Sequence, residues 1–340
     1  MKRLIRRWLN RYKNLRSKKK FESKSGIDLQ SLITACEEIV FNQTGKKVYT
    51  KFRDLGGANN YGMLMHYFEN NNAVAISKIE ENILAEREYR FLKWQKDYRD
   101  NSLSAEPFGL TPVLGTKYSC FISSVLEHPK QFSYTKAECL FDNLGQHPDL
   151  LSKLALSKIK KDLKDELDDS TKIKSILVHL VSKFGTINSE KFYKRFLLDR
   201  ENIFSNDHDA FINIKSLMDE VFSKLKNCDL EHYEGLVHGD FKSQNILEDD
   251  AAYKVIDCQY YTYGIRFWDL AFLYSKDSGG FKNIKIYLEK LLSFEEKSLM
   301  LFFYVIASLI NVKKKRASAV MKNKISPAAE YINQLLELRE

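Results

Sequence analysis

The stretch that decides the fold is LVHGDFKSQNILEDDAAYKVIDCQYYTYGIRFWDLAFLY, residues 236–274. Two short apolar runs, Ile246–Leu247 and Tyr253–Ile256, flank the polar sequence EDDAA, and this pattern predicts a β-hairpin. A hairpin folds back on itself, so the residues that precede its first strand and follow its second are expected to lie near each other. These residues are Asn245 and Asp257.

Asp240 stands in the loop that leads to this hairpin, and its side chain completes a set suited to phosphoryl transfer from a nucleoside triphosphate. A carboxylate accepts the proton of an attacking hydroxyl. Magnesium prefers a few hard oxygen ligands and keeps its waters, and Asn245 and Asp257 offer an amide oxygen and a carboxylate. Protein kinases use a catalytic-loop Asp, an Asn five residues later and a metal-binding Asp after a hairpin. The spacing therefore predicts an enzyme that uses ATP and Mg2+.

The order of these residues resembles the aminoglycoside phosphotransferase and choline kinase family, a branch of the protein-kinase-like fold. The family pattern is H-G-D-x-x-x-x-N, then I-D, then D-L-A, and it is matched by His238, Gly239, Asp240, Asn245, Ile256, Asp257, Asp269, Leu270 and Ala271. The resemblance implies that Asp240 is the catalytic base and that Asn245 and Asp257 bind Mg2+. It also implies that His238 and Asp269 support the catalytic loop. The competing interpretation, a hairpin with solvated acids, does not explain the ordered match.

A glycine-containing loop, GGANNYG at residues 56–62, precedes the motif between two expected strands, VYTKFRDL and MLMHYFE. Glycine lets such a loop bend tightly and brings backbone N–H groups close to phosphates. A loop of this kind is a weak signal alone, but this one opens a three-strand run that ends in a lysine. The family often carries a similar loop, and the resemblance implies nucleotide binding by Gly56, Gly57, Asn59 and Asn60.

Lys78 is expected at the close of the third strand, in AVAISK, followed by a helix from about residue 81 to residue 96. A lone strand lysine is usually a solvated edge residue. In kinase-like proteins this lysine contacts the nucleotide phosphates and pairs with a glutamate of the next helix. Glu86 and Glu88 are the two candidates for the glutamate. The family's R-E pair favours Glu88.

A loop marked by Pro107 and Pro112 is expected next, followed by a strand over residues 116–125. The connection at residues 123–128 would lead into the second lobe. In kinase-like folds the backbone of this connection contacts adenine, so the resemblance adds Ser124 and Leu126 to the predicted nucleotide site.

We therefore expect an α+β fold with a two-lobed, protein-kinase-like architecture: a small β-sheet N-lobe over residues 27–125 and a larger, mainly helical C-lobe over 126–340. Residues 1–26 form a separate basic amphipathic arm. Residues 135–230 and 281–340 show mostly helical patterns, and the apolar run Leu299–Ile310 predicts a buried core helix.

The formal net charge of +9 arises in the N-terminal arm, because residues 1–20 contain ten Lys or Arg and no acid. The rest of the chain is nearly neutral, which makes a nucleic-acid partner unlikely. Apolar side chains on one face of the arm, including Trp8, favour contact with an anionic membrane surface. Docking on the chain's own fold, a nucleic-acid tail and an organelle address remain open.

The five scattered cysteines argue against a disulfide framework. We expect a cytoplasmic protein, which the arm would place at the inner face of the membrane.

The hydroxyl acceptor stays open between a small molecule or sugar, such as a cell-envelope glycan or lipopolysaccharide component, a choline-like amino alcohol, and an aminoglycoside. Trp268, Tyr260, Tyr261 and Tyr263 are candidates for a choline cage, although core packing is the favoured interpretation. The basic run KKKR, residues 313–316, is interpreted as complementing a helix dipole. A catalytically inactive, kinase-like binding module is the alternative of another class, and the presence of the base, the metal Asp and the lysine argues against it.

Overall fold

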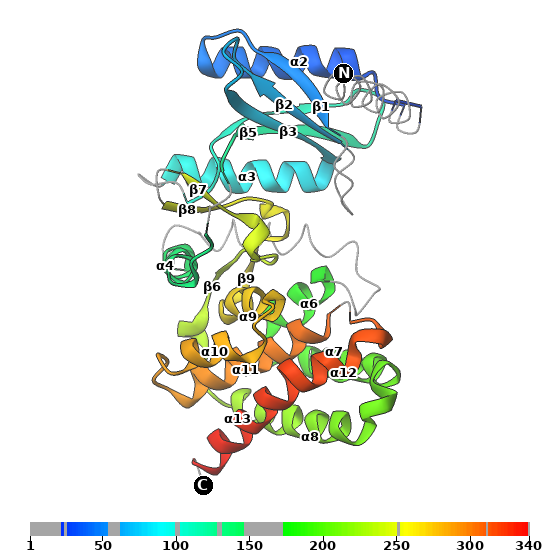
Figure 1. Ribbon diagram of the computed structural model, residues 1–340, viewed down its shortest axis with the longest axis vertical. Helices are drawn as coiled ribbons and strands as arrows, with labels where there is room; N and C mark the ends of the chain where they lie inside the picture. The colour runs from blue at the N-terminus through cyan, green and yellow to red at the C-terminus, as the bar shows by residue number, and fades with distance from the viewer. Residues whose placement is uncertain are drawn as a thin grey trace, which may run out of the picture. The chain divides into compact units, whose positions relative to one another are not determined.

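The computed structural model describes residues 22–23, 26–53, 62–98, 103–127, 131–145, 173–249, 252–310 and 312–338 (Figure 1). The chain forms two compact units. Unit 1 comprises Met1–Pro129 with Leu247–Gln259, and unit 2 comprises Lys130–Ile246 with Tyr260–Glu340. Residues 1–21 of the predicted N-terminal arm, and the loop with Gly56, Gly57, Asn59 and Asn60, lie outside the described residues.

Unit 1 is built on a five-stranded antiparallel sheet with the strand order β1-β2-β3-β5-β4. Its strands and helices are β1 (Tyr49–Arg53), β2 (Gly62–Tyr67), β3 (Ala73–Glu81), β4 (Pro107–Pro112), β5 (Tyr118–Ser124), α2 (Leu29–Thr44) and α3 (Asn82–Tyr98). Figure 1 shows α2 on one face of the sheet and α3 on the other. Because strand side chains alternate between faces, a strand of this sheet can direct side chains toward either helix.

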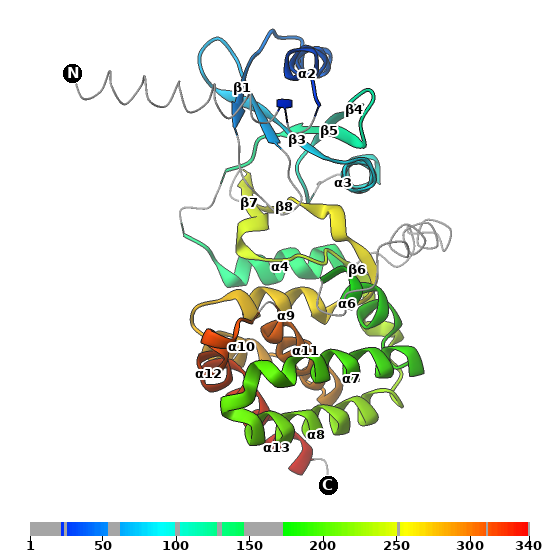
Figure 2. The ribbon, with the colours of Figure 1, turned by 90° about the vertical axis from the view of Figure 1, so that its right-hand side faces the viewer.

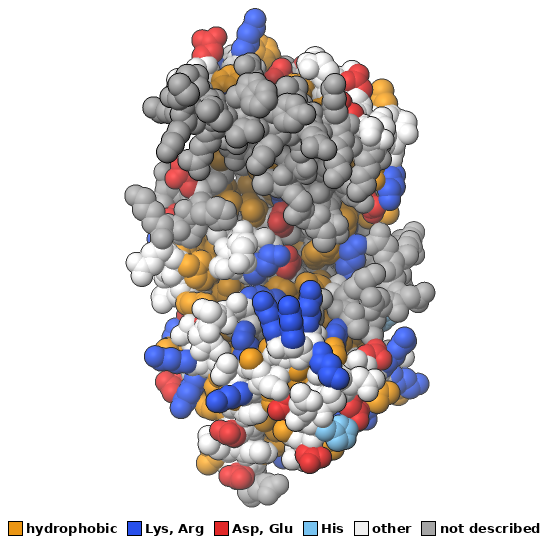
Figure 3. Space-filling view, turned by 45° about the vertical axis from the view of Figure 1, so that its right-hand side comes forward, with side chains coloured by type: hydrophobic (Ala, Val, Ile, Leu, Met, Phe, Trp, Pro, Cys, Tyr) orange, Lys and Arg blue, Asp and Glu red, His pale blue; other side chains and the backbone are white. Residues whose placement is uncertain are grey.

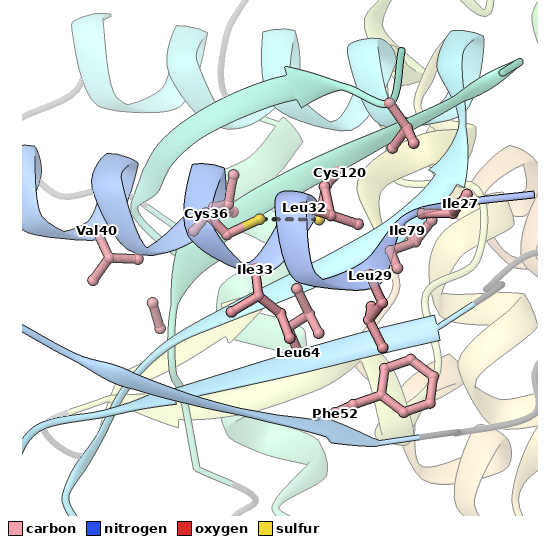
Figure 4. Packing of buried hydrophobic residues seen from close by; sticks show 13 residues of the cluster. Ile27, Leu29, Leu32, Ile33, Cys36, Val40, Phe52, Leu64, Ile79 and Cys120 are labelled. Atoms are coloured by element: carbon pink, nitrogen blue, oxygen red, sulfur yellow. Dashed lines mark hydrogen bonds between the residues drawn. The ribbon is translucent and has the colours of Figure 1, made fainter. Parts of the chain in front are cut away.

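The core of unit 1 lies between α2 and the sheet, as Figure 4 shows. Leu29, Leu32 and Ile33 of α2 project onto Phe52 and Leu64 of the strands. Helix α2 begins after the N-cap Asp28 and ends at Gly45, whose φ of 70° is favourable for glycine. Ala75 and Ile79 of β3 join this cluster, whereas Lys78 and Glu80, the two residues on either side of Ile79, lie near Glu88 of α3.

The segment Pro107–Pro112 is strand β4, so the prediction of a loop there was wrong. The strand lies at the edge of the sheet and pairs only with β5. An edge strand tolerates proline because one side of its backbone needs no ladder hydrogen bond. The prolines occupy the first and last positions of the strand, and its pairing register shifts between Pro107 and Gly109.

The predicted hairpin is confirmed, because β7 (Ile246–Asp249) and β8 (Ala252–Val255) form a two-stranded sheet. Backbone bonds join it to the rest of unit 1. Val255 N–H donates to Leu103 O at 2.8 Å, and Glu248 N–H donates to Glu127 O at 2.8 Å. The hairpin therefore belongs to the sheet-containing unit, although its sequence neighbours on both sides belong to unit 2.

Unit 2 is mainly helical and contains one two-stranded antiparallel sheet, β6 (Glu234–Val237) with β9 (Thr262–Ile265). Its longer described helices are α4 (Tyr134–Gly145), α6 (Ile173–His179), α7 (Ile187–Glu201), α8 (His208–Leu225), α9 (Phe267–Lys276), α10 (Phe281–Leu288), α11 (Phe294–Leu309) and α13 (Ser326–Glu337). The short elements α12 (Ala317–Val320), η7 (Lys314–Arg316) and the π-helical turn η8 (Met321–Ile325) lie between α11 and α13. A small sheet unit and a larger helical unit confirm the predicted fold class.

Helix α11 forms the centre of unit 2, and Figure 2 shows it among α7, α8 and α9. All its residues from Ser298 to Leu309 are buried, which confirms the predicted core helix. Trp268 of α9 packs against Phe303 of α11 with ring centroids 6.0 Å apart. No helix among the described residues is long and apolar enough to cross a membrane.

Candidate active site

The predicted site residues fall into two groups, one in each unit. Unit 2 contains the loop between β6 and β7, with His238, Asp240 and Asn245, and also Asp269 of α9. Unit 1 contains Lys78, Glu88, Asp257, Ser124 and Leu126.

Asp269 holds the loop of unit 2 through both of its carboxylate oxygens. The backbone N–H of His238 donates to Oδ2 at 2.7 Å, and that of Gly239 donates to Oδ1 at 2.9 Å. Burial raises the pKa of Asp269 to about 7, while the two backbone N–H groups act in the opposite direction. The neighbouring Trp268 donates its indole N–H to Gly239 O at 3.0 Å. Two consecutive residues of α9 therefore clamp the loop.

Gly239 is required at its position by backbone shape and by space. Its φ of 88° lies in the left-handed region, and a Cβ there would stand 2.6 Å from Tyr260 O. No other residue avoids both penalties. This contact explains in physical terms why glycine stands between His238 and Asp240.

The carboxylate of Asp240 is buried, and two described side chains hold its Oδ2 atom. Lys242 Nζ lies 2.5 Å from Oδ2, and Asn245 Nδ2 donates to the same oxygen at 3.0 Å. Asn245 also donates to the backbone carbonyl of Asp240 at 3.0 Å. No described residue hydrogen bonds to Oδ1.

In unit 1 the Lys78 ammonium contacts two carboxylates. Its Nζ lies 3.0 Å from Glu88 Oε1 and also contacts Asp257 Oδ1. Glu86 pairs with Arg90 on the surface instead, at 2.9 Å. Burial alone would lower the pKa of Lys78, but the carboxylates of Asp257 and Glu88 outweigh burial and hold this pKa above its ordinary range. The lysine is therefore a fixed positive charge.

Asp257 adopts a left-handed backbone conformation with φ of 57°. Such a conformation is uncommon for a residue other than glycine, although Asp and Asn tolerate it best, and it concentrates at functional sites. Glu88 Oε1 stabilises it by accepting the backbone N–H of Asp257 at 3.1 Å. One glutamate oxygen thus positions both the lysine and the predicted metal ligand.

Glu80 is a residue of this group that the sequence analysis missed. Strand β3 continues beyond Lys78 to Glu81, so Glu80 stands on the same face as Lys78. Ligand oxygens of Glu80, Glu88 and Asp257 lie within 4.8 Å of one another. Burial, followed by the charge of Glu88, raises the pKa of Glu80 to about 8. The group therefore places three acidic side chains near the Lys78 ammonium.

The remaining predictions concern the adenine contacts and an aromatic choline cage. Ser124 ends β5, and its backbone N–H already donates to Glu106 O at 2.8 Å, while Leu126 is half-buried. Among the aromatic candidates for a choline cage, Trp268, Tyr260 and Tyr261 are buried and Tyr263 is half-buried. Their burial favours core packing. Lys242 was also missed, because it stands at a variable position of the motif, and only its contact with Asp240 reveals it.

Comparison with known proteins identifies the segment that carries the motif. Residues 184–288 match the model of the phosphotransferase enzyme family. The resemblance to aminoglycoside phosphotransferases and choline kinases is confirmed. The phosphotransferase segment includes Asp240, Asn245, Asp257 and Asp269. No curated protein sequence matches the chain significantly.

Three solved structures illustrate the likeness to phosphotransferases. A thermostable mutant of aminoglycoside phosphotransferase APH(4)-Ia has a TM-score of 0.46 and 11% identity, covering 88% of this chain and 98% of that one. Choline kinase from Cryptosporidium parvum Iowa II has a TM-score of 0.47 and 13% identity, covering 91% and 95%. A putative fructosamine-3-kinase from Haemophilus somnus 129PT has a TM-score of 0.46 and 14% identity, covering 88% and 96%.

Proposed function

We propose that the protein transfers the γ-phosphate of ATP to a hydroxyl group of a small molecule or sugar. The observation that supports this most directly is the arrangement around Asp240, where Lys242 and Asn245 engage Oδ2 and leave Oδ1 for a substrate proton. The acceptor oxygen forms a bond to the γ-phosphorus as the bond to ADP breaks, and Asp240 takes the hydroxyl proton. A positioned base of this kind increases the reaction rate by about 10²- to 10⁴-fold.

The residues assigned to Mg·ATP supply hard oxygen donors and a fixed positive charge. The Asp257 carboxylate and the Asn245 amide oxygen are donors of the kind that magnesium prefers. Buried Glu88 Oε2 and Glu80 Oε2 have no hydrogen-bond partner among the described residues, and such unpartnered oxygens fit a site that receives a divalent cation. Bound magnesium would neutralise charge on the phosphates. Lys78 and the loop with Gly56, Gly57, Asn59 and Asn60 are assigned to the phosphates, and Ser124 and Leu126 to adenine.

The deciding experiment measures ATP binding by thermal shift with and without Mg2+, followed by ADP release over a panel of hydroxylated metabolites. We expect Mg2+-dependent stabilisation by ATP, slow hydrolysis without acceptor, and faster ADP release with the right acceptor. A protein that neither binds nor hydrolyses ATP would instead be an inactive binding module.

We further propose that residues 1–20 hold the enzyme at an anionic membrane surface, on the strength of their ten basic residues and single apolar face. Liposome co-sedimentation of the full chain and of a version that starts at Phe21 tests this. Equal pelleting of both proteins on anionic vesicles contradicts the proposal.

A further inference from the structure

Lys313–Arg316 follow α11 and have no role in its helix dipole. The helix ends at Leu309, the next residue is extended with ψ of 131°, and the last turn of the helix contains no basic residue. Helix-dipole stabilisation fades beyond the terminal turn, so the interpretation drawn from the sequence was wrong. The residues form their own short helix, η7, and all four are exposed.

These residues begin a strongly basic stretch that continues into η8. Between Lys313 and Lys324 the chain has six Lys or Arg residues and no acid. None of the six forms an ion pair with any described residue. Some other lysines of unit 2 are neutralised, as Lys194 is by Glu190 at 2.9 Å and Lys290 is by Glu138 at 2.6 Å. Figure 3 shows Lys and Arg side chains gathered on one face of this unit.

The basic stretch is anchored to the end of α9. Lys324 Nζ donates to Ser275 O at 2.5 Å and to Asp277 O at 2.9 Å, on either side of Lys276. Lys276 Nζ lies 3.5 Å from Ala307 O of α11, and its side chain still reaches solvent. These carbonyl contacts fix the two lysines in place without neutralising them.

Lys276 connects this basic stretch to the proposed catalytic base. Protein atoms around the Lys276 ammonium, followed by the positive charge of Lys324, lower its pKa to about 8. Lys276 stands two helical turns after Asp269 on the same face of α9, and Asp269 holds the loop that carries Asp240. Asp240 and Lys242 also act on the Lys276 ammonium, so the four side chains share one neighbourhood within unit 2. Together they carry three positive charges and one negative charge, and Asp277 adds a second negative charge beside Lys324. Such a surface repels a cationic acceptor and attracts an anionic one.

We propose that the acceptor is an anionic sugar, whose carboxylate or phosphate binds Lys276 and Lys324 while its hydroxyl faces Asp240. This inference rests on the proposed function. The exposed run Lys313–Arg316 extends the positive field and speeds the approach of the acceptor. An aminoglycoside or choline would place its own positive charge beside Lys276 and is disfavoured.

The test compares matched acceptors in ADP-release assays with the full chain and Mg·ATP. Neutral sugars are assayed beside their charged forms, such as glucose beside glucuronate and glucose 1-phosphate. We expect kcat/KM to be at least about tenfold higher for the charged member, as a hydrogen bond to a charged group provides. Equal or better turnover of neutral or cationic acceptors overturns the proposal while leaving the phosphotransferase function intact. Absence of both Mg·ATP binding and ADP release overturns the function itself.

Variants of Lys276 separate acceptor binding from other effects. Lys276→Gln is expected to raise KM for the anionic sugar at least about tenfold, with KM for ATP nearly unchanged, and Lys276→Arg is expected to restore most of the loss. Lys194→Gln, which removes an exposed lysine of α7, serves as the matched control. If no sugar of the panel is phosphorylated, isothermal titration calorimetry measures the affinities of the wild type and of Lys276→Gln for glucuronate and glucose 1-phosphate instead. Equal binding by wild type and Lys276→Gln contradicts the proposal.

A lipid surface is the other anionic partner that this basic stretch could meet. Anionic and neutral vesicles are therefore tested with the wild type and with a variant in which residues 313–316 are replaced by Gln. Loss of vesicle binding without any change in the kinetics of anionic sugars would assign Lys313–Arg316 to the membrane and overturn their proposed role in the approach of the acceptor.

Discussion

Asp269 of unit 2 and Glu80 of unit 1 are both buried carboxylates, and burial raises the pKa of each, to about 7 and about 8. Both oxygens of Asp269 accept backbone N–H groups. Among the described residues, Glu80 Oε2 has no hydrogen-bond partner, and neither has Oε2 of its neighbour Glu88. Buried polar groups are nearly always paired, so an exception calls for an explanation.

The difference shows which part of the proposed site the protein completes by itself. In unit 2 the clamp on the loop is finished, because backbone and side-chain donors satisfy Asp269 and position Asp240. In unit 1 the Lys78 ammonium contacts the carboxylates of Glu88 and Asp257, and Glu80 lies in the same group. The unpartnered oxygens of Glu80 and Glu88 are positions that the proposed Mg2+ would complete.

The largest expected effect tests the finished loop of unit 2. Asp240→Asn keeps the shape of the side chain but removes its capacity to accept a proton, so kcat should fall by about 10²- to 10⁴-fold. ATP affinity should be largely kept, because the lysine cluster belongs to unit 1. ADP-release kinetics and an ATP titration measure both. Asp209→Asn, an exposed position at the start of α8, is the control, and unchanged turnover of Asp240→Asn would remove the proposed base.

Acid should affect unit 1 through a third buried ionisable group, His66. Its ring nitrogens contact the hydroxyls of Thr50 at 2.8 Å and Ser77 at 2.6 Å, and burial lowers its pKa to about 4. The unfolded chain binds a proton near the ordinary pKa of 6.5, whereas the folded chain does not until pH nears 4. The free energy of unfolding should therefore fall as pH drops through this window, by up to about 3 kcal/mol.

Denaturation at a series of pH values measures this effect in wild type and in His66→Gln, which cannot titrate there. Hydrogen exchange should show the loss first in β1, β2 and β3. If the free energy of unfolding changes with pH in the same way in both proteins, His66 contributes no pH dependence. Acid would then not act on unit 1 through this residue.

Much of this arrangement could be predicted from sequence, where the determinants are local. The residues that form the hairpin and those from Asp240 to Asn245 are close together in the sequence. Their local pattern was sufficient to predict the hairpin and the candidate site. The choice of Glu88 rather than Glu86 agrees with the contact to Lys78. The nucleotide and catalytic roles remain predictions.

The missed features depend on tertiary position. Strand β4 contains two prolines, and only its place at the sheet edge makes a strand possible there. Glu80 was missed because the strand was expected to end at Lys78. Lys276 and Lys324 are far from Asp240 in sequence, and no local pattern relates three such segments. Charge counts alone could not show which lysines lack acidic partners.

The cation-dependent part of unit 1 should respond to a change at Asp257. Asp257→Asn keeps a residue that tolerates the left-handed backbone and removes only the charge. We expect affinity for Mg·ATP to fall by about 10- to 100-fold, the range seen when support for a bound metal is removed. Titrations of ATP with and without Mg2+ measure it. Wild-type affinity in this variant would show that the Asp257 charge does not support the metal.

The smallest effect should come from Glu80→Gln, with Glu88→Gln as its matched partner. Both substitutions replace a buried carboxylate of the same cluster by an amide of equal size. Glu88 Oε1 accepts bonds from Lys78 and from the backbone of Asp257, so its loss should weaken Mg·ATP binding by about tenfold, as for a hydrogen bond to a charged group.

Glu80 holds its proton at neutral pH, since its pKa is about 8. Glutamine resembles that neutral acid, so Mg·ATP affinity and kcat should change by less than about threefold, a surface-like effect near 0.5 kcal/mol. Isothermal titration of both variants at pH 7 separates the two residues. A loss for Glu80→Gln as large as that for Glu88→Gln would show that Glu80 acts as a charged member of the site, and the unpartnered oxygen would then belong to the metal-binding set.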